Sequence, residues 1–299
     1  MGLFDSYNED GIINLDTFME ENGIKDARMI YSEPLFTYDD KKYFANLNYE
    51  NYRNEIVAYE IAGIMRIHAA KYRYASYKNN QILLSDCPVS FVRATELFGE
   101  YVKQLNDRDT GIDSFNNIKQ ARNVFEWHVG KSNQGNNENP LIQKFIDVFT
   151  YDLIIKNDDR SHYNWGVFDN DGTADIHVYD SIDSSLNQPT LFFSDKTLLT
   201  FPMGINYSWD DKTLKESLKN LVEEIDITYL NSFYYWLTFF FNFNFQSFFA
   251  YMEIKYMFSM PTDYRKEVEQ RLKHNIYEIL TYISSELKKR KDFEQRIIL

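Results

Sequence analysis

The feature that most constrains the fold is a long apolar segment followed at once by a polar cluster. Residues 141–155 read LIQKFIDVFTYDLII, and residues 157–164 read NDDRSHYN. Apolar side chains recur in the first segment at intervals of four, three and four: Ile142, Ile146, Phe149, Leu153. This spacing predicts a helix with a buried stripe. The polar cluster is therefore expected at the end of a rigid, buried element.

A β-hairpin is predicted directly after the cluster. The segments NWGVF (164–168) and ADIHVYD (174–180) flank DNDGT, and an Asp-Gly pair tolerates the positive φ angles of tight turns. The fixed register of a hairpin returns the chain to the end from which it left. We therefore expect Asn164 and Asp180 to converge.

Asp159, Asn164 and Asp180 suit a phosphoryl-transfer site. Such a site needs a carboxylate that orients the attacking hydroxyl, and oxygen ligands that hold Mg²⁺ against a triphosphate. Asp159 precedes Asn164 by five positions. The spacing alone favours a plain polar helix end, because Asp and Asn are frequent in turns and caps. Asp183 is an alternative to Asp180 as the second metal ligand.

The N-terminal third predicts short strands around one helix. Strands are expected over 28–38, 41–49, 71–77 and 82–86, and a helix over 51–67. Longer helical patterns follow Pro88. The predicted fold class is α+β and bilobal, with a small strand-rich lobe over 1–88 and a larger, mainly helical lobe over 89–299.

The residues around the hairpin resemble the core of the HipA-like kinases. The family pattern runs roughly as an apolar helix, N-x-D-x-H-x-x-N, a hairpin and Y-D. The matching residues here are Asn157, Asp159, Asn164, Tyr179 and Asp180. The resemblance is strong over about 142–186 and only topological elsewhere. It implies a protein-kinase-like fold that transfers the γ-phosphate of ATP to serine or threonine on a protein, and the family includes bacterial persistence toxins and a secreted effector kinase.

The resemblance also implies roles for the matching residues. Asp159 would be the catalytic base, while Asn164 and Asp180 would bind Mg²⁺. The family His falls at Ser161 here, with a His one place later at His162, and this departure concerns the substrate-facing part of the loop.

The nucleotide side of the expected site is less regular. Glu55 would pair with an ATP-binding lysine, provisionally Lys42, with Lys41 and Lys71 as alternatives. A natural alignment places Asn46 at the lysine position, and an amide lacks the point charge that steadies phosphates. The sequence also has no Gly-rich phosphate loop near residues 31–42. A pseudokinase that acts as an interaction module, or a small-molecule kinase, are the alternative functions.

The connection between the two expected lobes could hold the adenine edge of ATP. It comprises Asp86, Cys87 and Pro88, and a plain inter-lobe connection is an equally good interpretation.

Composition limits the partners. The formal net charge of -13 disfavours direct nucleic-acid binding, which relies on Lys and Arg. The single cysteine, Cys87, cannot form an intramolecular disulfide, and no signal peptide is recognisable, so a cytoplasmic location is expected. Residues 233–252 are strongly aromatic, but Asn242, Asn244 and Gln246 favour a buried helix over a membrane span. The expected partners are a protein substrate and an antitoxin or regulatory protein.

Overall fold

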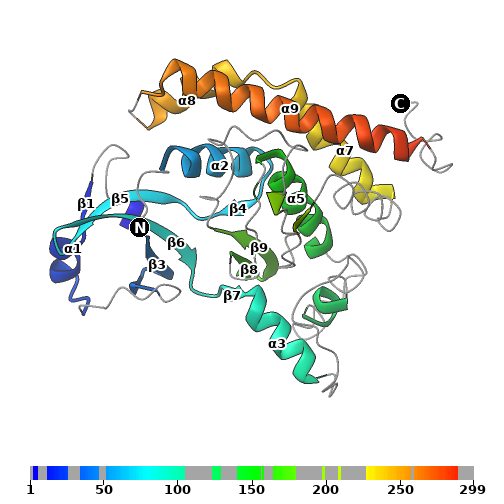
Figure 1. Ribbon diagram of the computed structural model, residues 1–299. Coiled ribbons are helices and arrows are strands. Elements are labelled where there is room, and N and C mark those ends of the chain that lie inside the picture. The colour runs from blue at the N-terminus through cyan, green and yellow to red at the C-terminus, as the bar shows by residue number, and fades with distance from the viewer. Residues whose placement is uncertain are drawn as a thin grey trace.

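The computed structural model describes residues 3–5, 12–25, 34–46, 52–104, 123–128, 140–155, 157, 164–179, 197–198, 208–209, 227–256 and 259–288. A strand-rich N-terminal part is followed by a mainly helical C-terminal part (Figure 1). The α+β class predicted from the sequence is confirmed.

The N-terminal part is built on a five-stranded sheet. Its strand order is β1-β5-β6-β3-β2. The strands are β1 (Ile13–Asn14), β5 (Tyr72–Tyr77), β6 (Asn80–Pro88), β3 (Lys41–Asn46) and β2 (Phe36–Tyr38). β1 pairs with β5 in parallel, and the other pairs are antiparallel. The β2–β3 and β5–β6 turns each contain two residues with positive φ, as two-residue hairpin turns require: Asp39, Asp40, Lys78, Asn79.

The two faces of this sheet are covered by different helices. The 3₁₀ helix η1 (Leu3–Asp5) and α1 (Leu15–Glu21) pack on the face that contains Tyr43 and Leu84. Helix α2 (Tyr52–Ile64) packs on the face that contains Leu83. Helix α1 was not predicted from the sequence; it begins where the Asn14 side chain accepts a hydrogen bond from the backbone N–H of Thr17 (3.1 Å).

The C-terminal part is organised around the predicted buried helix and hairpin. Helix α5 (Pro140–Ile155) packs against β9 and α7. The hairpin consists of β8 (Trp165–Asn170) and β9 (Thr173–Val178), and its turn residues Asp171 and Gly172 have positive φ. Short strands from the preceding chain flank it, giving the order β4-β9-β8-β7, with β4 at His68–Ala69 and β7 at Val92–Arg93. Residues 89–91 thus connect the two sheets.

The remaining described elements lie mostly in the C-terminal part. They are α3 (Ala94–Gln104), a short helix over 123–128, β10 (Thr197–Leu198), β11 (Ser208–Trp209), α7 (Ile227–Phe241), α8 (Phe245–Lys255) and α9 (Thr262–Leu287). Buried residues of α2, α5, α7, α8, α9 and the hairpin belong to one continuous hydrophobic core.

The aromatic segment forms two helices where the sequence suggested one. The side-chain NH₂ of Asn242 donates to the carbonyl of Thr238 (2.9 Å) just after α7 ends, and the Asn244 side chain accepts from the N–H of Ser247 (3.1 Å) to cap α8. The asparagines that argued against a membrane span therefore also break the helix. Within the described residues, no helix is both long and apolar enough to cross a membrane.

The C-terminal helices hold α2 from outside the sheet. Glu60 of α2 accepts hydrogen bonds from the ammonium of Lys255 (2.7 Å) and from the hydroxyl of Tyr256. Asn54 accepts one from the hydroxyl of Tyr264 on α9 (2.9 Å). Figure 1 shows α8 and α9 running alongside α2, so this helix is fixed to both parts of the chain.

Candidate functional site

The hairpin has a buried face and a face that meets the N-terminal sheet. Trp165, Val167, Ile176 and Val178 belong to the main core. The side chains that alternate with them lie on the other face, which includes Phe168, His177 and Tyr179 around Gly166. Because Gly166 pairs with His177 and Phe168 with Asp175, these residues share one side of the hairpin.

Asn164 lies at the start of this hairpin, where the chain leaves the polar cluster. The backbone N–H of Tyr179 donates to the carbonyl of Asn164 (3.0 Å), and Asn164 is 7% exposed. The hairpin therefore returns Tyr179, the residue before Asp180, to the side of Asn164. Asp159 and Asp180 lie outside the described residues, so their positions and roles remain predictions.

The turn after α5 is anchored by a side-chain pair. The NH₂ of Asn157 donates to the carboxylate of Asp152 (3.2 Å), and the backbone N–H of Asn157 donates to the Asp152 carbonyl (2.9 Å). Both residues are buried. Asn157 is thus held against the last turns of α5.

Asn164 is the one predicted Mg²⁺ ligand that the structure describes. Its amide oxygen is the kind of hard donor that Mg²⁺ accepts, and its place beside the returning strand fits that role. The described residues contain no group of three or more His, Cys, Asp or Glu side chains that could hold a metal ion.

The N-terminal sheet presents Lys42 and Phe44 toward the hairpin. Lys42 lies opposite Cys87, and its ammonium donates to the carbonyl of Phe91 (3.4 Å). Phe44 stacks parallel to Tyr179, with ring centroids 6.4 Å apart. The predicted Lys42 contact with Glu55 stays a prediction. Lys42 bonds at the inter-sheet connection, and Glu55 is buried on α2, 1% exposed.

Asn46 is the last residue of the same strand, β3. It is opposite Leu83, and the period of two along a strand places it on the same face as Lys42. The two alternatives to Lys42 as the ATP-binding lysine, Lys41 and Lys71, both contact Asp86. Lys41 forms an ion pair with Asp86, and the backbone N–H of Lys71 donates to the Asp86 carboxylate (3.0 Å).

The connection at residues 86–91 has its polar groups largely engaged. The N–H of Val89 donates to the carbonyl of Asp40 (3.0 Å), and the N–H of Phe91 donates to the carbonyl of Pro88 (3.1 Å). Pro88 has no N–H. Burial, followed by the charge of Asp86, raises the pKa of the Cys87 thiol, although Lys42 and Arg93 oppose the shift. The Cys87 thiol is therefore neutral, and the expected contact of residues 86–88 with adenine stays a prediction.

An aromatic cluster joins the connection to the hairpin. The ring of Phe91 contacts Tyr179 and His177 edge-on, with centroids 5.5 and 5.8 Å away. A Cβ at Gly166 would lie 2.2 Å from the carbonyl oxygen of Val92 and 2.6 Å from the Phe91 ring. The Val92 carbonyl and the Phe91 ring thus leave no room for a side chain at position 166. No role was predicted for Phe44, Phe91 or Gly166 from the sequence.

His177 lies buried within this cluster, 5% exposed. Desolvation, reinforced by the charges of His68 and Lys41, lowers its pKa from 6.5 to about 3, although a backbone hydrogen bond to Asp86 and the charge of Asp175 oppose the shift. Its spacing in the sequence predicts a structural or surface role, and the buried neutral ring has a structural one.

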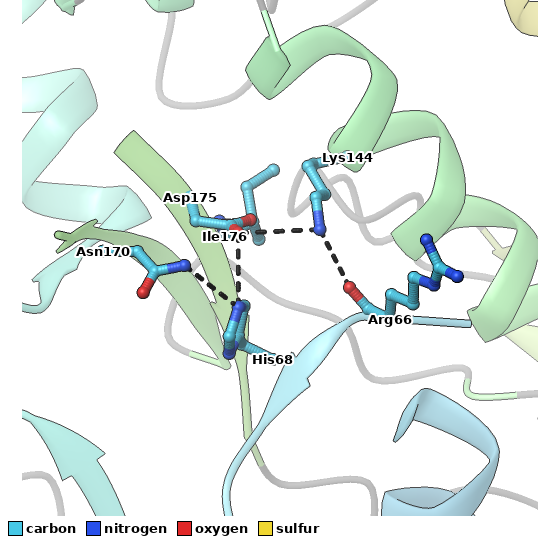
Figure 2. Close-up of polar contacts among 6 residues, drawn as sticks. All are labelled: Arg66, His68, Lys144, Asn170, Asp175 and Ile176. Atoms are coloured by element: carbon cyan, nitrogen blue, oxygen red, sulfur yellow. Dashed lines mark hydrogen bonds and ion pairs between the residues drawn. The ribbon is translucent and has the colours of Figure 1, made fainter. Parts of the chain in front are cut away.

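A network of polar residues connects the hairpin to α5 and to the chain after α2 (Figure 2). The Asp175 carboxylate lies 3.3 Å from Nε2 of His68 and 3.5 Å from Nζ of Lys144. Lys144 also donates to the carbonyl of Arg66 (2.8 Å), and the NH₂ of Asn170 lies 3.4 Å from Nε2 of His68. This network was not predicted from the sequence, where its local signal is an acidic residue at a buried strand position.

The network also determines the ionisation of Asp175. Burial alone would raise its pKa, but hydrogen bonds from His68 and from the N–H of Ile176, with the charge of Lys144, lower it below the ordinary value. Three elements that lead into the candidate site are thereby tied together by one ionised carboxylate.

The chain is similar to known proteins at the level of solved structures. No protein-family model matches the chain, and no curated protein matches it. Among solved structures, the chain is similar to the crystal structure of a Helicobacter pylori proinflammatory kinase, CtkA. The two are 16% identical, the match covers 84% of this chain and 94% of that chain, and the TM-score is 0.45.

Proposed function

We propose that this protein is an ATP-dependent kinase of HipA-like type that phosphorylates serine or threonine on a protein. In this proposal Asp159 orients and deprotonates the attacking hydroxyl. Asn164 and Asp180 hold Mg²⁺, which neutralises the charge that develops on the phosphates. ATP lies between the N-terminal sheet and the hairpin.

The observation that supports the proposal most directly is the closure of the hairpin. Tyr179 hydrogen-bonds to Asn164 over 3.0 Å, so the two ends of the motif are adjacent although 15 positions separate them in the sequence. The buried Asp152–Asn157 pair also holds Asn157, the first residue of the motif, against α5. Both features are what the kinase interpretation of the N-x-D-x-x-x-x-N pattern requires.

The test is ATP-dependent autophosphorylation by the full chain. Asp159→Ala and Asp180→Ala should each abolish phosphate incorporation while leaving the thermal unfolding curve unchanged. Asp171→Asn is the matched control, because this residue lies in the exposed hairpin turn with a φ of 52°, which asparagine tolerates. Full phosphorylation by both alanine variants would refute the assigned roles.

A pseudokinase is the second candidate, and Asn46 is the observation that favours it. A natural alignment of the sequence with the family pattern places this residue at the expected lysine position, on β3. A ligand that binds only the folded chain raises its apparent stability by mass action. A thermal shift with Mg·ATP accompanied by phosphate transfer supports the kinase. A shift without transfer supports the pseudokinase, and no shift supports a pure interaction protein.

A further inference from the structure

A pocket of about 1020 Å³ lies between α2, α7 and α8, away from the hairpin. Five aromatic rings line it: Tyr235, Phe239, Phe243, Phe248, Tyr251. Tyr235 and Tyr251 are 57% and 52% exposed, respectively, although both are large apolar side chains. The pocket is at the upper end of the size range of small-molecule sites, roughly 300–1,000 Å³, and such sites are mostly apolar and aromatic.

Gly63 provides a second, independent observation. This residue lies within α2 and lines the pocket, and a Cβ added to it would meet no atom within 4 Å. Glycine is among the poorest helix formers, so packing does not explain its presence. The helix end does not explain it either, because the left-handed residue there is Arg66, with a φ of 58°. The absent side chain leaves the backbone of α2 open to an occupant.

The charge of the lining residues indicates the class of occupant. Glu60 is the charged residue in the described lining, and its carboxylate already pairs with Lys255 over 2.7 Å. The pocket therefore offers no uncompensated charge to an ionic ligand. Its neutral polar lining comprises Thr238, Asn242, Asn244 and Ser247, and each asparagine uses one side-chain atom in the helix break described above.

We propose that this pocket binds an uncharged small molecule with an aromatic ring system and one hydrogen-bonding end. The rings of the ligand would stack on the aromatic walls, which favour offset and edge-on contacts. The amides of Asn242 and Asn244 would bond its polar end. The site is separate from the proposed nucleotide site, so it does not depend on kinase activity.

Nile red, a neutral polycyclic dye, is the probe for the full-length chain. Wild-type protein should give saturable, blue-shifted fluorescence with one dye per chain. Gly63→Leu places a side chain in the open space and should weaken the affinity by about tenfold or more. The same change should raise the melting temperature by about a few degrees, because leucine is a better helix former. Opposite effects on binding and stability distinguish ligand contact from damage to the fold.

Gly99→Leu is the matched control. Gly99 lies within the exposed face of α3, and a Cβ there would also meet no atom within 4 Å. This variant should gain similar stability and bind Nile red as the wild type does. Equal affinity in the two leucine variants, or binding that does not saturate at one site, would overturn the proposal. Binding of the anionic dye ANS as tightly as Nile red would overturn the assignment to neutral ligands.

Discussion

His177 predicts a specific loss of stability in mild acid. Its pKa is lowered from 6.5 to about 3 in the folded chain. Between these values the unfolded chain binds a proton that the folded chain does not, so the free energy of unfolding falls as the pH drops through this window. At about pH 5 the gap from 6.5 corresponds to about 2 kcal/mol, at 1.36 kcal/mol per pH unit.

The cause of this effect is the environment of the ring. Phe91 and Phe168 contact His177 edge-on, with centroids 5.8 and 5.9 Å from it. The groups that face it electrostatically are His68, Lys41 and Asp175. A protonated ring would lose its hydration among the two phenyl groups, and the nearby carboxylate offsets only part of that cost.

Urea unfolding measured by circular dichroism at about pH 7.5, 6 and 5 tests the prediction. The wild type should lose about 2 kcal/mol more between the highest and the lowest pH than His177→Gln, which cannot titrate. His274→Gln is the matched control, because His274 is exposed on α9. Equal pH dependence of the wild type and His177→Gln would refute the burial of a neutral imidazole in the cluster.

Three further substitutions test local features of the fold by urea unfolding. Gly166→Ala should cost about 3 kcal/mol or more because its Cβ would overlap the Val92 carbonyl and the Phe91 ring, and an unchanged midpoint would show that β7 and the ring do not approach β8 this closely. Asn244→Ala should cost about 1 kcal/mol through loss of the α8 cap, and the far-UV signal should remain near that of the wild type. Asp175→Asn should cost about 1–3 kcal/mol at neutral pH. Because the pKa of Asp175 is lowered, its contribution is present above 3.8 and is lost as the pH falls through the folded value, so this variant should lose less stability in acid than the wild type.

Local sequence signals predicted the elements that depend on near neighbours. Asp-Gly predicted the β8–β9 hairpin, and the apolar stripe of residues 142–153 predicted α5. Both follow from contacts within about ten residues, which periodicity and turn preferences capture. The α+β class followed from their order along the chain.

Features that depend on distant partners were not predictable. β4 pairs with β9 across more than 100 positions, His68 lying beside His177. The close approach of Phe91 to Gly166 also depends on tertiary packing, and no local pattern marks it. The short α1 was missed because its apolar residues are too few to show a period.

The candidate site divides in the same way. The return of Tyr179 to Asn164 follows from hairpin register, and the sequence was sufficient to expect it. Which lysine side chain would face a phosphate depends on the sheet face and on the register of each strand position. The strand register places Lys42 opposite Cys87 and Asn46 opposite Leu83, and that register is set by pairing with β6, which composition does not encode.

The contacts of α2 with the C-terminal helices have a consequence for folding during synthesis of the chain. Glu60 hydrogen-bonds to Lys255, which lies 195 positions later in the sequence. Asn54 hydrogen-bonds to Tyr264, which lies 210 positions later. During synthesis the N-terminal sheet can form early. Helix α2 lacks these two hydrogen bonds until synthesis has passed residue 264. Contacts of such large sequence separation form late and slowly. During that interval Glu60 and Asn54 of α2 lack the hydrogen-bond partners that the C-terminal helices supply.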